Sequence, residues 1–133
     1  SPIYETEPCG APEAFAALHY LNMAVIVETS LPPLILSEAV HAVERAMGRR
    51  RGACPNLPRN IDIDIICHGE ITLATPVLTL PHPRAHLRRF VLQPLSDLLP
   101  GLILPGQTGT VTDLLRGLPE TPRVARWNYG LRQ

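Results

Sequence analysis

The stretch that decides the fold and the chemistry reads Arg59-Asn60-Ile61-Asp62-Ile63-Asp64-Ile65-Ile66. Successive side chains of a β-strand point to opposite faces, so the first three isoleucines would share one face and Asp62 and Asp64 the other. The isoleucine face would be buried against a core and hold the aspartates on a rigid platform. The pattern predicts a strand over residues 61–67 that presents two carboxylates on one side.

Two same-face aspartates on a strand lie about 7 Å apart between their Cα atoms, so their side chains can converge on hard cations. Mg²⁺ prefers carboxylate and phosphate oxygens and keeps several waters. Two such ions about 4 Å apart can clamp both ends of a phosphoryl displacement. The alternative is a half-exposed strand with solvated acids, although strands disfavour aspartate and neighbouring like charges repel. We therefore predict that Asp62 and Asp64 bind metal.

Positive charge gathers around this stretch, although the net charge is zero. All twelve basic residues are arginines; seven lie in residues 49–89 beside three acids, whereas residues 1–48 hold one beside six. The planar guanidinium suits phosphate oxygens, and a basic middle on a neutral chain favours a small anionic ligand over a long nucleic acid. A solvated arginine surface is the alternative. Candidate anion donors are Arg49, Arg59, His82, Arg84 and Arg88.

Length and composition indicate one globular domain over residues 1–133. Hydrophobic residues make up 45% and charged residues 18%, enough for a core and too few charges for a disordered chain. No apolar run is long enough for a membrane span, and no leader suggests secretion. The three scattered cysteines predict neither disulfides nor zinc, so a reducing cytoplasm is the expected location. Neither a GxxxxGK[ST] nor a GxGxxG loop is present.

Turn residues and periodicity predict strands alternating with helices. Strands are expected at 20–29, 61–67 and 102–104, with 71–73 pairing back as a hairpin. Helices are expected from Pro32 to a cap at Gly48, from 84 to 95 with Pro94 weakening the last turn, and over 111–117. Residues 7–19, 49–60 and 78–83 read as loops, and the last fifteen residues carry no assignment. The pattern favours a two-layer α+β sandwich.

The stretch Pro58–Asp64 resembles the signature of hydroxymethyldihydropterin pyrophosphokinases. Flanking segments resemble the same family in order and spacing over residues 1–117, and they are Ser1–Pro8, Tyr20–Asn22, Glu44–Arg49, Leu80–Pro83 and Arg88–Leu95. The resemblance implies a ferredoxin-like α+β sandwich. It also implies transfer of a pyrophosphoryl group from ATP to 6-hydroxymethyl-7,8-dihydropterin, which yields AMP in folate biosynthesis.

Site roles follow from the resemblance for each matching position. Asp62 and Asp64 would hold two Mg²⁺ ions, and Arg49 and Arg59 would contact phosphates, with Arg59 stabilising the charge in transfer. The ATP side would be formed by Glu44, Thr79, His82 and Arg88. For the pterin, Tyr20 and Phe90 would sandwich the ring, Asn22 would pair with its polar edge, and Thr6, Cys9 and Gly10 would complete that edge.

The sequence departs from the family pattern at several places. Ser1 falls at the family's second strand, so its first strand and Gly-Ser-Asn loop have no counterpart, and we expect an N-terminally incomplete sandwich with exposed strand edges. Pro55–Pro58 replaces a basic residue and a Trp-Gly-like pair in a loop that closes over the family's site. Pro83 stands where an aromatic residue is common, and the loop between Thr6 and Tyr20 is a few residues longer.

Three function classes fit these observations. The first is the pyrophosphokinase, with ATP and the pterin as partners, neither nucleic acid nor membrane, and association with other folate enzymes. The second is a catalytically inactive pterin- or nucleotide-binding relative or interaction domain, which would bind without forming AMP. The third is a ferredoxin-like RNA-binding module, which the aspartates disfavour because they repel phosphate unless metal intervenes.

Overall fold

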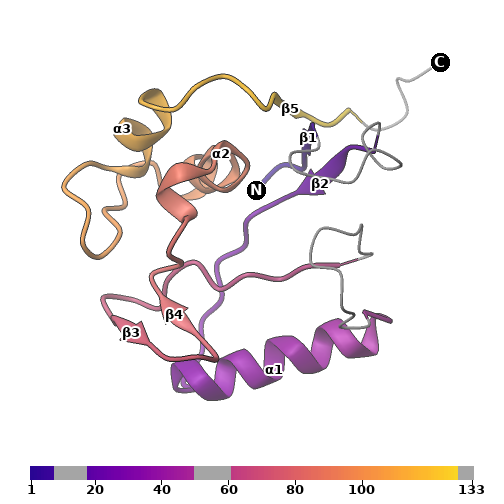
Figure 1. Cartoon of the computed structure of the whole chain (residues 1–133), viewed down its shortest axis with the longest axis vertical. Coiled ribbons are helices and arrows are strands. Elements are labelled where there is room, and N and C mark those ends of the chain that lie inside the picture. Colours follow the sequence, from indigo (N-terminus) through magenta and orange to yellow (C-terminus); the bar gives the residue numbers. More distant parts are fainter. Residues whose placement is uncertain (8–17, 50–60, 129–133) are drawn as a thin grey trace.

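The computed structural model describes residues 1–7, 18–49 and 61–128. The chain there combines short antiparallel strands with helices (Figure 1). The strands are β1 (Tyr4–Thr6), β2 (Tyr20–Asn22), β3 (Leu73–Ala74), β4 (Thr79–Leu80) and β5 (Val124–Arg126), and the helical elements are α1 (Pro33–Ala46), the 3₁₀ turn η2 (Ala85–Leu87), α2 (Arg89–Leu98) and α3 (Val111–Arg116). An α+β class is therefore confirmed.

The larger sheet has the order β2-β1-β5, with both pairs antiparallel. Tyr4 lies opposite Asn22 on one side and opposite Arg126 on the other. The pairing continues beyond β5, where the Trp127 N–H donates to the Ile3 carbonyl at 2.9 Å. The segment that the sequence left unassigned thus supplies the second partner of the central strand.

The strand predicted over residues 20–29 is limited to Tyr20–Asn22. The register of β1 and β2 would place Pro2 opposite Ala24, and proline has no N–H to donate to a ladder. Two hydrogen bonds between Ser1 and Ala24 end the pairing instead. The Ser1 amino group donates to the Ala24 carbonyl and the Ala24 N–H donates to the Ser1 hydroxyl, each at 2.9 Å.

The strand predicted over residues 61–67 is also absent, because none of the described strands pairs with this segment. Its side chains still alternate: Asp62 and Asp64 are exposed, and the isoleucines at 61, 63 and 65 are half-buried. The predicted arrangement of one apolar and one acidic face is therefore confirmed without the predicted ladder.

The hairpin after this segment forms between different residues from those predicted. A turn closes where the Ile71 N–H donates to the His68 carbonyl at 3.1 Å, but residues 71–73 do not pair with residues 61–67. Instead β3 pairs with β4, with Leu73 opposite Leu80. The Thr75 hydroxyl accepts the Leu78 N–H and donates to the Leu78 carbonyl, each at 2.9 Å, which stabilises the tight connection.

Helix α1 begins and ends as the prolines and glycine predict. Pro33 occupies the first helical position, where a missing N–H costs nothing. Gly48 has a φ of 89°, and its N–H donates to the Arg45 carbonyl while the Arg49 N–H donates to the Glu44 carbonyl, both at 3.0 Å. These two bonds form a Schellman motif, which turns the chain back over the last helical turn.

The predicted helix over 84–95 is divided in two. Arg88 is extended, with φ −117° and ψ 113°, and separates η2 from α2. Pro94 lies inside α2 without ending it: its ring is buried and the helix continues to Leu98. The helix thus extends three residues beyond the predicted end at residue 95, and Pro94 lies before the last turn.

The core forms where α2 meets α3, around buried Leu92, Leu95 and Val111. Helix α3 begins as predicted, with a capping box between Thr110 and Asp113. The strand predicted over 102–104 is absent, because the Leu102 carbonyl accepts the Val111 N–H at 2.8 Å and so connects this segment to α3.

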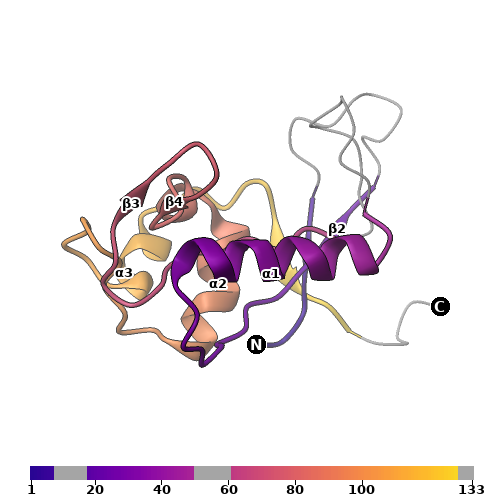
Figure 2. The same ribbon diagram turned by 90° about the horizontal axis from the view of Figure 1, so that it is seen from below.

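Helix α1 lies apart from the larger sheet, at the opposite end of the molecule's long axis (Figure 1). In the view from that end, α1 passes in front of α2 (Figure 2). Its side chains Leu34, Ile35 and Val43 are exposed, as are those of residues 25–27. None of the described helices has both the length and the apolar character needed to cross a bilayer.

Candidate active site

Asp62 and Asp64 lie close enough on the extended segment 61–67 for their charges to interact. Partial burial, and next the negative charge of Asp62, raise the pKa of the Asp64 carboxyl. The guanidinium of Arg88, and His82 when its imidazole is protonated, act in the opposite direction. The structure thus brings together two predicted metal ligands and two predicted ATP contacts.

Arg49 lies between two carboxylates. Its Nη1 donates to Asp62 Oδ1 at 2.8 Å and to Glu44 Oε2 in a second, shorter contact. The Glu44 side chain is only 2% exposed, and its Oε2 also accepts the Ile63 N–H at 3.0 Å. The desolvation of Arg49 is outweighed by these acids, so the pKa of its guanidinium is raised and the group stays charged.

The end of α1 explains why Glu44 and Arg49 meet. Residues five apart on a continuing helix would not face each other, because neighbours on one face are three or four apart. The Schellman motif at Gly48 turns the chain, so that Arg49 returns over the last turn that carries Glu44. A glycine read from the sequence as a cap therefore also places a site residue.

His82 is held beside the aspartates by its own backbone. The His82 N–H donates to the Ile66 carbonyl at 2.8 Å, and its Nδ1 accepts the Arg84 N–H at 3.2 Å. Burial lowers the pKa of the imidazole, the negative charge of Asp64 opposes this, and the positive charges of Arg88 and Arg84 add to it. His82 is therefore chiefly neutral at pH 7.

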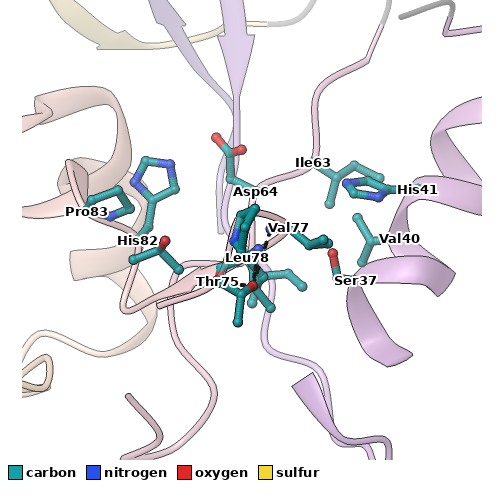
Figure 3. A pocket seen from close by; sticks show the side chains of 13 residues that line it. Ser37, Val40, His41, Ile63, Asp64, Thr75, Val77, Leu78, His82 and Pro83 are labelled. Carbon is teal, nitrogen blue, oxygen red and sulfur yellow. Dashed lines mark hydrogen bonds between the residues drawn. The ribbon is translucent and has the colours of Figure 1, made fainter. Parts of the chain in front are cut away.

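A cavity of about 260 Å³ lies beside Asp64 (Figure 3). In Figure 3, Asp64 and His82 lie on one side, and Ser37, Val40 and His41 of α1 lie on the other. The predicted residues in its lining are Asp64, Thr79 and His82. Sequence reasoning missed Ser37, His41 and Thr75; the spacing of Ser37 and His41, four apart on a helix, was the signal that could have grouped the first two.

The predicted pterin residues gather at the larger sheet. Asn22 Nδ2 donates to Thr6 Oγ1 at 2.8 Å, and Thr6 is buried. Tyr20 lies opposite Thr6 at the end of β2, half-buried, and Phe90 lies in α2, which packs against β1 and β2. The Arg88 guanidinium carbon lies 5.4 Å from the centre of the Phe90 ring, within cation–π range. Cys9, Gly10 and Arg59 lie outside the described residues.

The acidic pair fits a magnesium ion better than a site built from protein ligands alone. Within residues 1–7, 18–49 and 61–128, no three His, Cys, Asp or Glu side chains are grouped to hold a metal. Mg²⁺ is commonly bound by one or two carboxylates together with substrate phosphates and water. Asp62 and Asp64, both exposed and next to cationic side chains, supply that donor set.

Comparison with known proteins agrees with this chemistry. The chain is 39% identical over 105 residues to the 2-amino-4-hydroxy-6-hydroxymethyldihydropteridine pyrophosphokinase of Pseudomonas aeruginosa, covering 79% of this chain and 62% of that protein. It is 40% identical over 98 residues to the Bacillus subtilis protein of the same name, covering 74% and 56%. It is 39% identical over 97 residues to the mitochondrial folate synthesis bifunctional protein of Pisum sativum, covering 73% and 18%.

The chain thus spans about three fifths of the length of the two bacterial relatives. A sequence profile of one family, described as 7,8-dihydro-6-hydroxymethylpterin-pyrophosphokinase, matches residues 1–100, a range that includes every predicted site residue. The chain belongs to the 7,8-dihydro-6-hydroxymethylpterin-pyrophosphokinase family.

Proposed function

We propose that this protein transfers a pyrophosphoryl group from ATP to 6-hydroxymethyl-7,8-dihydropterin and releases AMP. The proposal rests on family membership and on the names of its relatives. The single structural observation that supports it is the Asp62–Asp64 pair, whose charges interact and which lies near His82 and Arg88, with Asp64 and His82 in the lining of a cavity. Acidic metal ligands close to a guanidinium group are among the parts that phosphoryl transfer needs.

Asp62 and Asp64 would hold two Mg²⁺ ions, whose chemistry is to neutralise phosphate charge and align the attacking and leaving oxygens. Arg49 and Arg59 would stabilise charge on the phosphates. Thr79 and His82 would contact the nucleotide from the cavity lining, and Arg88 from the entrance to α2. Glu44 would serve the ATP side from the end of α1.

The pterin would bind at the larger sheet. Tyr20 and Phe90 would stack on the two faces of its ring, since aromatic planes bury large area with few internal rotations. Asn22 would pair with the polar edge, and its hydrogen bond to Thr6 fixes the orientation of the amide that would do so. Cys9 and Gly10 would complete that edge from the loop after β1.

These roles would be carried by one domain over residues 1–133 with a ferredoxin-like arrangement. The bifunctional name of the pea relative supports association with other enzymes of folate synthesis. Such association would place the pterin diphosphate near the enzyme that uses it.

The direct test is AMP release from ATP and Mg²⁺ with and without hydroxymethyldihydropterin. We expect AMP only when both the pterin and Mg²⁺ are present, and loss of turnover in Asp64→Asn with an unchanged circular-dichroism spectrum. Asp113→Asn is the matched control, because Asp113 is an exposed aspartate at the start of α3 outside the site. Binding of both substrates without AMP would overturn the proposal in favour of an inactive binding protein.

A further inference from the structure

Glu44 carries a buried carboxylate at the edge of the site, and burial of a charged group costs free energy. A carboxylate that is almost fully removed from water needs charged or hydrogen-bonding partners to remain ionised. Glu44 Oε2 has two of them: the guanidinium of Arg49 and the N–H of Ile63 at 3.0 Å. Ile63 lies between the two candidate metal ligands, so Glu44 is connected to the acidic segment through its backbone.

A second connection runs through Arg49. The same Nη1 that contacts Glu44 donates to Asp62 Oδ1 at 2.8 Å, so one nitrogen is shared by two carboxylates. The Arg49 side chain is 12% exposed, whereas that of Asp62 is 51% exposed. The contact with Asp62 is thus made by an arginine that is largely removed from solvent.

The charges of Glu44 and Arg49 affect how strongly a cation can bind at Asp62. An arginine paired only with Asp62 would neutralise it and compete with a metal for its oxygens. Glu44 balances the charge of Arg49 from the other side, so that the one guanidinium is shared between two carboxylates. The hydrogen bond to Ile63 also fixes the backbone between the two aspartates.

We propose that Glu44 is a positioning residue, which acts through Arg49 and the Ile63 N–H to hold the Asp62 carboxylate in place for a divalent cation. This inference rests on the proposed function and deepens it, because it assigns to Glu44 a role at the metal ligand in place of a contact with the nucleotide. Partners behind a metal ligand typically change metal affinity by about 10–100-fold when they are removed.

The test is Mn²⁺ binding to the whole chain, measured by electron paramagnetic resonance with the metal alone. Wild type should bind Mn²⁺, and Asp62→Asn should lose that binding. Glu44→Gln should weaken it by about tenfold or more, because the introduced amide can still accept the Ile63 N–H but cannot balance Arg49. Glu38→Gln, an exposed glutamate on the same helix, is the matched control and should change Mn²⁺ affinity less than about threefold.

The discriminating variant is the double substitution Glu44→Gln with Arg49→Met. It removes the unbalanced arginine, so Mn²⁺ affinity should return to within about threefold of wild type if Glu44 acts through Arg49. No recovery, an unchanged affinity in Glu44→Gln, or no Mn²⁺ binding by wild type would each overturn the inference. The AMP assay is separate: restored Mn²⁺ binding without AMP formation would support the role of Glu44 and reject the proposed reaction.

Discussion

The His82 backbone N–H donates to the Ile66 carbonyl at 2.8 Å, which connects the loop after β4 to the segment that carries the aspartates. These residues are sixteen apart in sequence, and this bond, together with the charge interaction between the His82 and Asp64 side chains, brings the loop to the cavity. Main-chain hydrogen bonding thus fixes the position of His82. Its Nδ1 accepts the Arg84 N–H, so Nε2 is the ring atom that would contact a ligand.

Replacement of His82 tests that role. His82→Ala should lower kcat/KM for ATP by about tenfold, the value of one hydrogen bond to a charged group, without changing the thermal midpoint by more than a few degrees. Because the pKa of His82 is lowered, the imidazole acts as a neutral donor, and the loss should be similar at pH 7 and pH 8. The control is His86→Ala, a histidine of η2 that does not line the cavity; equal losses in both variants would contradict the assignment.

A side chain at Gly48 should destabilise the end of α1. Its φ of 89° is unfavourable for residues with a Cβ, so Gly48→Ala should lower the free energy of unfolding by about 1–2 kcal/mol and move Arg49 away from Glu44. Chemical denaturation measures the first effect. Gly101→Ala is the control, because a Cβ there would meet no atom within 4 Å and the backbone φ is not positive; a similar loss in that variant would count against the cap explanation.

The α2–α3 core should depend on Leu92, which is 0% exposed. Leu92→Ala should lower the free energy of unfolding by about 2–5 kcal/mol, through lost burial and the cavity left behind. Leu87 of η2 is 61% exposed, so Leu87→Ala should cost less than about 0.5 kcal/mol. Urea denaturation measures both values. Equal losses of unfolding free energy in the two variants would contradict a core centred on Leu92.

The capping box of α3 should make stability depend on pH. Hydrogen bonds from the Thr110 N–H and hydroxyl lower the pKa of the Asp113 carboxyl below 3.8. The native state therefore binds fewer protons than the unfolded state near this pH, so the contribution is complete above about pH 3.8 and is lost as the pH falls through the lower native pKa.

The thermal midpoint of wild type should consequently exceed that of Asp113→Asn at pH 6, and the difference should shrink below pH 3.8. The asparagine amide can still accept a bond from Thr110 but does not titrate. Calorimetry between pH 6 and pH 3 measures the difference, and a gap that is independent of pH would show that the carboxylate charge is not involved.

Local signals predicted the elements whose causes are local. The ends of α1 follow from Pro33 and Gly48, and the start of α3 follows from Thr110 and Asp113, because proline geometry, positive φ and capping hydrogen bonds act within a few residues. The alternation of Asp62 and Asp64 with isoleucines was also readable, since it depends only on the two-residue period of an extended chain.

Strand pairing was poorly predicted, because a ladder needs a partner that may lie anywhere in the chain. The segments 20–29 and 61–67 have the composition of strands, yet only Tyr20–Asn22 pairs, and β5 was not predicted at all. The division of the second helix at Arg88 likewise follows from how η2 and α2 pack together with α3. Propensity is a weak guide where packing decides.

The sequence by itself determined the family of this protein and the alternation of an acidic pair with isoleucines, in a part of the chain that is rich in arginine. Residue types and a two-residue spacing were enough, because they need no information about distant segments. Only the tertiary structure decided that Arg49 lies between Glu44 and Asp62, and that Ser37 and His41 face the cavity beside Asp64. Those relationships depend on how a helix end, an extended segment and a loop pack together, and such packing is a property of the whole fold.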